Sequence, residues 1–428
     1  MQALLKLGSG ILALTLALAP AARAAERLNN PSIESVLSST DWTPRGPATL
    51  TRDFGIKDHG GASLRIAGRT ATWNGTRQEL TGRITTGNVY RITARVRMNS
   101  GGNDTIAAQL IGENNNGTAA NQFLANVTTG TAWADIDTTF VAGLPGYDRY
   151  YLSFSGPAVG RIFHVDNTAL RDVYGDRSVY FTNHTNGFTY DLGKMLGDFG
   201  NVTKKDGNDT YSASEIDRTL ISSNGLRVRL LDNMLDDGGM VANTDIVPGS
   251  EYTLSYRVKF ADGFKWTLGG KLHGLSGGNG YAGGMTKTYG LPGNDGRGWS
   301  VRVMWGVNGR LYPYVYHANQ PTQYGDTFNG VDLISNAADD TWYRIKIYVK
   351  VNTGSNPNGI LKIYVTEASQ STDVERFSRT TLRFATEPDF HNVNQLRWSC
   401  FFGGGEDSWK PDGDQYVYFD DFILDRIN

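Results

Sequence analysis

The stretch WSVRVMWGVNGRLYPYVYH, residues 299–317, decides the local fold. Apolar and polar residues alternate on both sides of Asn308-Gly309, which is typical of two antiparallel strands joined by a tight turn. A two-residue turn at Asn308-Gly309 would mix polar and apolar side chains on both faces. A three-residue loop over 307–309, a type I turn with Gly309 in the left-handed region, keeps one face entirely apolar. Because a buried sheet face must be apolar, we expect the three-residue loop.

This loop fixes the register of the hairpin. It pairs Arg302 with Tyr314 and Ser300 with Tyr316, so these four residues share one face. Tyr312 is expected to form the wall of a cleft beside them. The opposite face then carries only apolar residues: Trp299, Val301, Val303, Trp305, Leu311, Pro313 and Val315.

The composition of the chain indicates an all-β protein. Its 428 residues include 52 glycines and 11% aromatic residues. Segments with a period of two recur, for example at 90–98, 252–260 and 343–351. Lys and Arg total 41 and Asp and Glu total 43, so the charge gives no reason to expect a nucleic-acid partner. One short helix is predicted, near Asp191–Leu196.

The N-terminus has the pattern of a secretion signal. Lys6 precedes an apolar run from Leu7 to Ala19, and Ala22-Arg23-Ala24 fits the cleavage rule, so residues 1–24 are predicted to be a signal peptide. The pattern predicts a secreted or periplasmic protein. No other segment is long enough to span a membrane as a helix.

Two blocks of strands follow the signal. Residues 163–173, FHVDNTALRDV, and 418–427, YFDDFILDRI, end them with similar strands. We therefore expect two tandem β-sandwich domains of the jelly-roll kind, at 25–173 and 178–428, joined by a linker at 174–177. The protein is expected to be a monomer.

Cations and phenols gather in the second block. GKLHGL predicts Lys271 and His273 on one strand face, and the hairpin adds Arg302 and its tyrosines. Lys and Arg can neutralise a carboxylate, and a tyrosine whose pKa is lowered by neighbouring cations can move a proton. This set favours β-elimination from a uronic acid, in which an enolate-like anion must be stabilised.

Two other functions stay open at this point. A glycoside hydrolase needs two carboxylates on one face, and the candidates are Glu215 with Asp217, or Glu406 with Asp407. A lectin of two jelly rolls would bind an acidic glycan without cleaving it.

The second block resembles polysaccharide lyase family 14. The similarity rests on GGKLHGLSGG, GWSVRVMW, YPYVYH and CFFGGGEDSWKPDGDQYVYFDDF, and covers roughly residues 178–428. It implies a β-jelly-roll cleft that cleaves an acidic polysaccharide, alginate or glucuronan, by β-elimination without a catalytic cofactor. It also implies five catalytic residues: Lys271, Ser300, Arg302, Tyr314 and Tyr316.

Other residues are expected to contact the substrate. His273, which stands where the family motif K-L-P-G-L has Pro, joins Tyr312 and His317 as a subsite contact. Trp409 and Lys410 are expected on a loop at the rim of the cleft. The long Gly-rich loop 279–297 is a second departure from the family and bears on subsite shape.

The first block resembles carbohydrate-binding modules of the family 4, 9 and 22 type. The resemblance rests on LNNPSIES, DHGGASLRIAGRTATWNG, GNVYRITARVRM and FHVDNTAL. Arg69 and Trp73 are the candidates for glycan binding, because flat aromatic rings stack on sugars and Arg binds hydroxyls. The resemblance also implies one structural calcium ion, with Glu34 and Asp166 as its carboxylate ligands.

Overall fold

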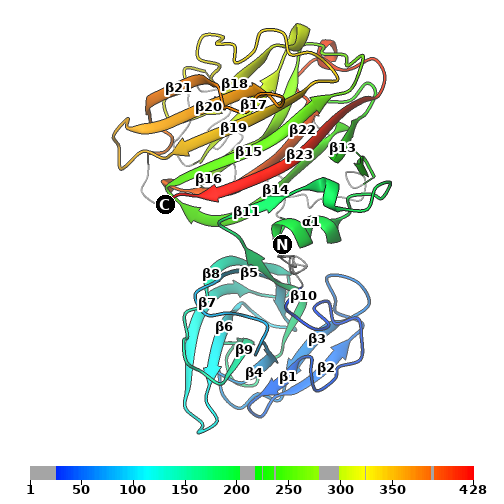
Figure 1. Cartoon of the computed structure of the whole chain (residues 1–428). Helices are drawn as coiled ribbons and strands as arrows, with labels where there is room; N and C mark the ends of the chain where they lie inside the picture. Colours follow the sequence, from blue (N-terminus) through cyan, green and yellow to red (C-terminus); the bar gives the residue numbers. More distant parts are fainter. Residues whose placement is uncertain are drawn as a thin grey trace, which may run out of the picture.

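The structure, a computed structural model, describes residues 26–202, 217–223, 225–235, 238–278, 298–322, 324–386 and 390–428. The expected signal peptide, Glu215 and the loop 279–297 lie outside these residues. Figure 1 shows two β-sandwiches, one above the other, joined where β10 leads into β11. Strands in antiparallel sheets dominate both, so the prediction of an all-β fold is confirmed.

The N-terminal sandwich consists of two five-stranded sheets, with strand orders β1-β4-β9-β6-β7 and β2-β3-β10-β5-β8. Alternate residues point inward; in β5 every second side chain is buried. Trp42 belongs to this core and is 2% exposed. The strands are β1 (Thr43–Arg45), β2 (Thr49–Asp53), β3 (Ser63–Ala67), β4 (Gly75–Glu79), β5 (Val89–Met98), β6 (Asp104–Glu113), β7 (Ala119–Thr129), β8 (Ala134–Val141), β9 (Arg149–Ser155) and β10 (Phe163–Val173).

The C-terminal sandwich has one sheet of eight strands and one of five. The larger sheet has the order β12-β13-β23-β15-β19-β20-β21, with β11 paired to β23, and the smaller has the order β14-β22-β16-β17-β18. The strands are β11 (Arg177–Val179), β12 (Thr219–Ser222), β13 (Gly225–Leu230), β14 (Met240–Gly249), β15 (Glu251–Phe260), β16 (Gly270–Gly278), β17 (Gly298–Trp305), β18 (Leu311–Tyr316), β19 (Trp342–Lys350), β20 (Gly359–Glu367), β21 (Glu375–Leu382), β22 (Val393–Phe402) and β23 (Gln415–Arg426).

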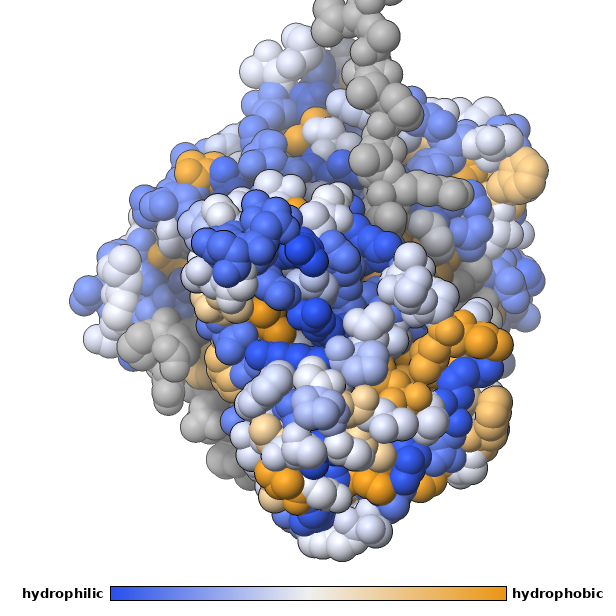
Figure 2. Space-filling model, turned by 90° about the horizontal axis from the view of Figure 1, so that it is seen from below, coloured by the Kyte–Doolittle hydropathy of each residue, from blue (hydrophilic) through white to orange (hydrophobic). Residues whose placement is uncertain are grey.

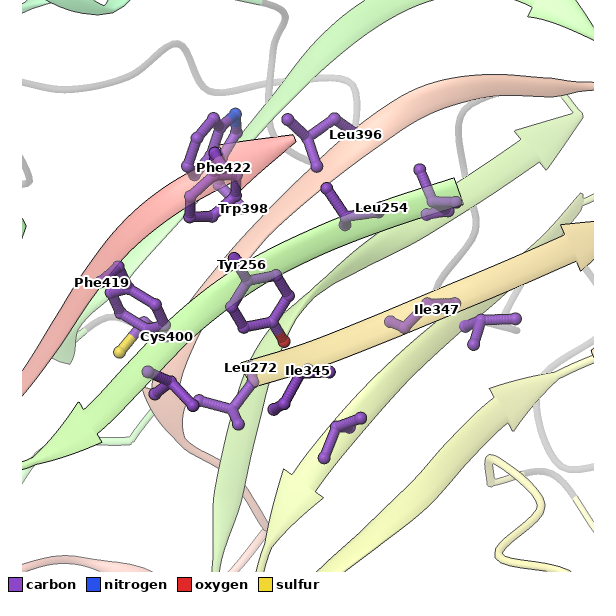
Figure 3. Packing of buried hydrophobic residues seen from close by; sticks show 14 of the residues in the cluster. Leu254, Tyr256, Leu272, Ile345, Ile347, Leu396, Trp398, Cys400, Phe419 and Phe422 are labelled. Atoms are coloured by element: carbon purple, nitrogen blue, oxygen red, sulfur yellow. The ribbon is translucent and has the colours of Figure 1, made fainter. Parts of the chain in front are cut away.

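A large apolar core lies between these two sheets. Figure 3 shows Leu272 of β16 near Cys400 of β22, and Trp398 of β22 beside Phe422 of β23, with Tyr256 of β15 between the two groups. The predicted short helix is present as α1 (Leu192–Phe199), which begins where the Asp191 side chain accepts a hydrogen bond from the amide of Lys194. The inner face of the small sheet is therefore buried, and its other face is left for a site.

The two sandwiches contact each other near β14. Tyr174 forms a parallel bridge with Ile246, and Arg91 Nε of β5 lies 3.3 Å from Asp245 Oδ2 of β14. Among the described residues, no helix is both long and apolar enough to cross a membrane. Figure 2, which views the chain from the N-terminal sandwich, shows a mostly hydrophilic surface with small apolar groups.

Candidate active site

The turn between β17 and β18 has three residues, as predicted. The amide of Gly306 donates to Arg310 O at 2.8 Å, and 307–309 form one 3-10 turn. Gly309 has φ +76°, and a Cβ there would lie 2.1 Å from Ala337 O, so only glycine fits. The expected type I geometry is wrong, because Asn308 also adopts a left-handed conformation, with φ 57°. Asn tolerates this conformation better than most residues.

The predicted register is confirmed. Arg302 lies opposite Tyr314, and Ser300 lies opposite Tyr316. Residues directly opposite in an antiparallel pair point to the same face, so these four side chains share one surface. The seven residues predicted for the apolar face are all buried.

The side chains of this face are close together. The hydroxyl oxygens of Tyr314 and Tyr316 are 3.1 Å apart, and their rings meet edge to face. The guanidinium carbon of Arg302 lies 5.6 Å from one ring centre and 5.8 Å from the other. Ser300 Oγ is buried and has no hydrogen-bond partner among the described residues. A polar atom in this position is available to a ligand.

Lys271 of β16 joins the same face. It lies opposite Met304 of β17, and its Nζ is 5.5 Å from the ring centre of Tyr314 and 5.1 Å from that of Phe401. The structure thus brings Lys271 together with Ser300, Arg302, Tyr314 and Tyr316. We call these five residues the catalytic patch.

His273 does not share the face of Lys271, and this part of the prediction is wrong. From Lys271 to Gly274, β16 contains one residue more than the matching part of β17, so a β-bulge turns His273 into the core. Its ring is fully buried beside Phe419, and its Nδ1 accepts from the amide of Ser399. Burial lowers the pKa of His273 to about 3. His273 therefore packs on the buried inner face of the small sheet, not on the face of the catalytic patch.

The pKa values of Tyr316 and Tyr312 are raised, whereas the sequence predicted a lowered pKa for the catalytic tyrosine. Burial raises the pKa of Tyr316, Tyr314 adds to the rise, and Arg302 opposes it. Burial also raises the pKa of Tyr312 to about 12. The net shift of the Tyr316 pKa is therefore upward, against the expectation, because burial outweighs the effect of Arg302. Tyr312 lies opposite Met304 at the edge of the catalytic patch, where a cleft wall was expected.

His317 is not brought to the catalytic patch. Its ring stacks on Phe328 of the core, and its Nε2 lies 3.2 Å from Asp326 Oδ2. Burial lowers its pKa, while Asp326 acts in the opposite direction. The expected subsite contact is therefore replaced by a link between β18 and the following loop, because His317 directly follows Tyr316 and takes the opposite side of the strand.

The loop after β22 does reach the catalytic patch. A Cβ on Gly403 would lie 2.3 Å from Lys271 Nζ, and one on Gly404 would lie 2.2 Å from the ring of Trp409. These glycines let the backbone pass between the ammonium and the indole. Lys410 Nζ lies 2.8 Å from Asp407 Oδ1. Trp409 and Lys410 are both half-buried, and their contact with substrate stays a prediction.

The carboxylates of the hydrolase alternative form no pair in the described residues. Asp217 is exposed, and its expected partner Glu215 lies outside those residues. Glu406 and Asp407 are exposed, and Asp407 is engaged by Lys410. Glu406 and Asp407 therefore form no enclosed pair of carboxylates, and the pair of Glu215 with Asp217 stays a prediction.

In the N-terminal sandwich, Arg69 does not face a ligand, and that prediction is wrong. The residue is 3% exposed, and its guanidinium donates to backbone carbonyls of two loops, among them Asn74 O at 2.8 Å and Thr72 O at 3.0 Å. It also donates to Pro157 O and Arg161 O. Arg69 therefore fastens these loops together.

Trp73 is 53% exposed and stands beside polar residues that the sequence alone did not reveal. The guanidinium of Arg45 lies 5.8 Å from the Trp73 ring centre and donates to Gln109 Oε1 at 2.9 Å. Arg77 lies over the ring of Tyr151 at 4.1 Å. The sequence does not indicate a binding role for Arg45, because β1 has only three residues, too few to show alternation. We call these five residues the aromatic face.

Glu34 and Asp166, the residues expected to bind calcium, both accept hydrogen bonds from one loop. Asp166 Oδ2 accepts from the amides of Asp58 and His59 at 2.8 and 3.0 Å, and Glu34 Oε2 accepts from Gly61 at 2.8 Å. Burial raises the pKa of Asp166. In the described chain no group of three His, Cys, Asp or Glu could hold a metal. Calcium also takes backbone and water oxygens, so a calcium ion at Glu34 and Asp166 stays a prediction. Both carboxylates hold the loop 58–61.

Comparison with known proteins agrees with this geometry. The family model Polysaccharide lyase 14 matches residues 239–422, and the model of a carbohydrate binding domain, CBM_4_9, matches residues 25–160. A solved mutant of alginate lyase Aly36B, in complex with alginate tetrasaccharide, is 32% identical with a TM-score of 0.52, and the match covers 60% of this chain and 98% of that one.

Two further matches are weaker. The marine PL-14 alginate lyase from Aplysia kurodai is 24% identical, over 58% of this chain and 97% of that one, with a TM-score of 0.46. Endo-1,4-beta-xylanase A from Thermoanaerobacterium saccharolyticum is 29% identical over 139 residues, which are 31% of this chain but only 12% of the xylanase. Residues 239–422 are a polysaccharide lyase 14 domain, and the chain is a polysaccharide lyase that carries a carbohydrate-binding module.

Proposed function

We propose that the protein cleaves a uronate polymer by β-elimination, with the catalytic patch as its active centre. The observation that carries this proposal is the register of β17 and β18, which holds Arg302, Ser300 and two phenols on one face. Lys271 brings a second cation from β16. Two cations beside two proton-carrying groups suit a reaction that removes a proton next to a carboxylate.

The reaction balances without an added water or oxidant. Lys271 and Arg302 bind the uronate carboxylate and neutralise its charge, and Ser300 donates a hydrogen bond to it. A base removes the C5 proton, the electron pair forms the C4=C5 double bond, and the C4–O bond breaks. The leaving oxygen takes a proton from an acid. Because side chains supply the positive charge, the proposed reaction needs no metal ion.

The tyrosines suit different parts of this reaction. Burial raises the pKa of Tyr316, so its phenol keeps its proton at neutral pH and suits the acid. Tyr314 is half-buried, and both Lys271 and Arg302 lie within 6 Å of its ring centre. Tyr314 therefore lies next to the two cations that hold the carboxylate, close to the C5 proton, and suits the base.

Alginate is the first substrate to test, with glucuronan second. The support is the 32% identity to an alginate lyase solved in complex with alginate tetrasaccharide. The aromatic face would hold the same polymer outside the cleft. We further propose export of a monomer through residues 1–24; an exported form whose N-terminal peptide begins at Ala25 would support this, and retention of Met1 would contradict it.

A product assay separates the lyase from a lectin. The full-length protein should release unsaturated oligouronates from alginate or glucuronan, and Lys271→Ala should abolish release while the protein still binds the polymer. Retention on both polymers, with no new chain ends at any enzyme concentration, would support the lectin instead.

A further inference from the structure

A second arginine lies in line with Arg302 on the same face of the small sheet. Gly274 of β16 is the direct partner of Arg302 on β17 and of Arg397 on β22. Tyr314 continues the same row on β18. The row therefore runs Arg397, Gly274, Arg302, Tyr314 across four adjacent strands.

The face of Arg397 follows from its neighbours in β22. Leu396, Trp398 and Cys400 are fully buried in the core, and Figure 3 shows them there. Alternation places Arg397 on the opposite side, with Arg302. Its exposed fraction, 5%, is close to the 4% of Arg302.

Gly274 leaves the space between the two arginines without a side chain. A Cβ at this position would lie 1.9 Å from Val301 O and 2.9 Å from Arg302 Cγ. The stem of Arg302 thus lies against Gly274, on the side of β22. Neighbouring strands are about 4.8 Å apart, so the backbones of Arg302 and Arg397 are separated by roughly 10 Å.

The charge on this part of the sheet is positive. Lys271, Arg302 and Arg397 lie on the three central strands. In the described part of the small sheet, one strand residue carries a carboxylate, Asp245 on the edge strand β14. Arg91 of the N-terminal sandwich lies 3.3 Å from it. A polymer with a carboxylate on each sugar matches cations that are spaced along one row of a sheet.

We propose that Arg397 binds the carboxylate of the uronate next to the reacting one, on the β22 side of the cleft. Lys271 and Arg302 hold the reacting carboxylate, and the chain runs along the row across the strands. This deepens, and rests on, the proposed lyase function. The enzyme therefore requires two successive uronates, not one uronate within a neutral chain.

The test combines a variant with a modified substrate. Wild-type protein is given an oligouronate and the same oligomer with the neighbouring carboxyl reduced to a neutral alcohol. We expect the reduced oligomer to show a KM about tenfold or more higher, with kcat within about twofold. Arg397→Met should bind both oligomers equally weakly, and Arg397→Lys should restore part of the difference. Arg344→Met, on the other sheet, is the matched control and should retain the full difference.

Three results would contradict the proposal or the function on which it rests. Equal KM values for the two oligomers with wild-type protein would overturn the role of Arg397, even if Arg397→Met does not fold. A preference that survives in folded Arg397→Met would overturn it as well. If wild-type protein cleaves no uronate oligomer at all, the proposed lyase function has failed instead.

Discussion

Arg302 lies directly opposite Tyr314, with its guanidinium carbon 5.6 Å from the centre of the phenol ring. This relationship makes Tyr314 the phenol to test first. Tyr314→Phe should lower kcat about 100- to 10,000-fold, the usual range for loss of a general base or acid. KM should change little, because the ring and the cations remain. A folded Tyr314→Phe variant with wild-type kcat would remove Tyr314 from the mechanism.

Arg302 should not be replaceable by lysine. Its planar guanidinium can bind a carboxylate through two parallel hydrogen bonds, which an ammonium cannot. Arg302→Lys should therefore keep the fold and lower kcat/KM about 100-fold or more. Steady-state rates on alginate, with circular dichroism as the control for folding, check this. Wild-type kcat/KM in Arg302→Lys would mean that only the charge matters.

The proposed chemistry should not depend on a bound metal ion. Incubation with a chelator and removal by gel filtration should leave the rate of oligouronate release within about twofold, because Lys271 and Arg302 supply the positive charge. A rate that falls on chelation, and returns when a divalent ion is added, would contradict this reaction scheme.

Substitution of two residues of the module should affect different properties, polymer binding for Trp73 and stability for Arg69. Trp73→Ala should weaken retention on the polymer without changing module stability, because the ring is half exposed. Arg69→Ala should lower the free energy of unfolding of the module by roughly 3 kcal/mol, since buried carbonyls lose their donor. Affinity electrophoresis and urea unfolding measure the two effects. Loss of stability in Trp73→Ala, or none in Arg69→Ala, would reverse these assignments.

His273 should make the C-terminal sandwich sensitive to acid. Its pKa is about 3 when folded and near 6.5 when unfolded, so the unfolded state binds the extra proton between these values. This part of the stability is complete above pH 6.5 and is lost as pH falls toward 3, by roughly 1.4 kcal/mol per pH unit.

His273→Asn provides the matched comparison. The Asn oxygen can still accept the amide of Ser399, but it does not titrate. Urea unfolding at pH 7 and pH 4.5 should show a smaller loss of stability at low pH than in the wild type. Equal losses in both proteins would contradict the assignment.

The sequence predicted the hairpin well because one physical requirement governs it. An apolar inner face allows a single register, and that register places Arg302 opposite Tyr314. The same alternation located the strands of both sandwiches. It did not predict the left-handed Asn308, because a three-residue loop can reach the same register with more than one backbone conformation.

The errors arose where one residue or one distant loop changes the outcome. An extra residue in β16 turns His273 inward, and the alternation of GKLHGL gives no sign of it. Arg69 binds carbonyls near residues 72 and 157, which are far apart in the chain. The sequence also did not indicate that Glu34 and Asp166 hold backbone amides of one loop, because these residues are far apart in the chain.

The measurement that most directly tests the account is the mass of the products from a uronate oligomer of known length, followed together with ultraviolet absorbance. Elimination predicts two fragments whose masses add up to that of the parent oligomer, with a rise in absorbance from the C4=C5 double bond. Fragments that together contain one additional water for each cleavage, with no change in absorbance, would show hydrolysis and contradict the account.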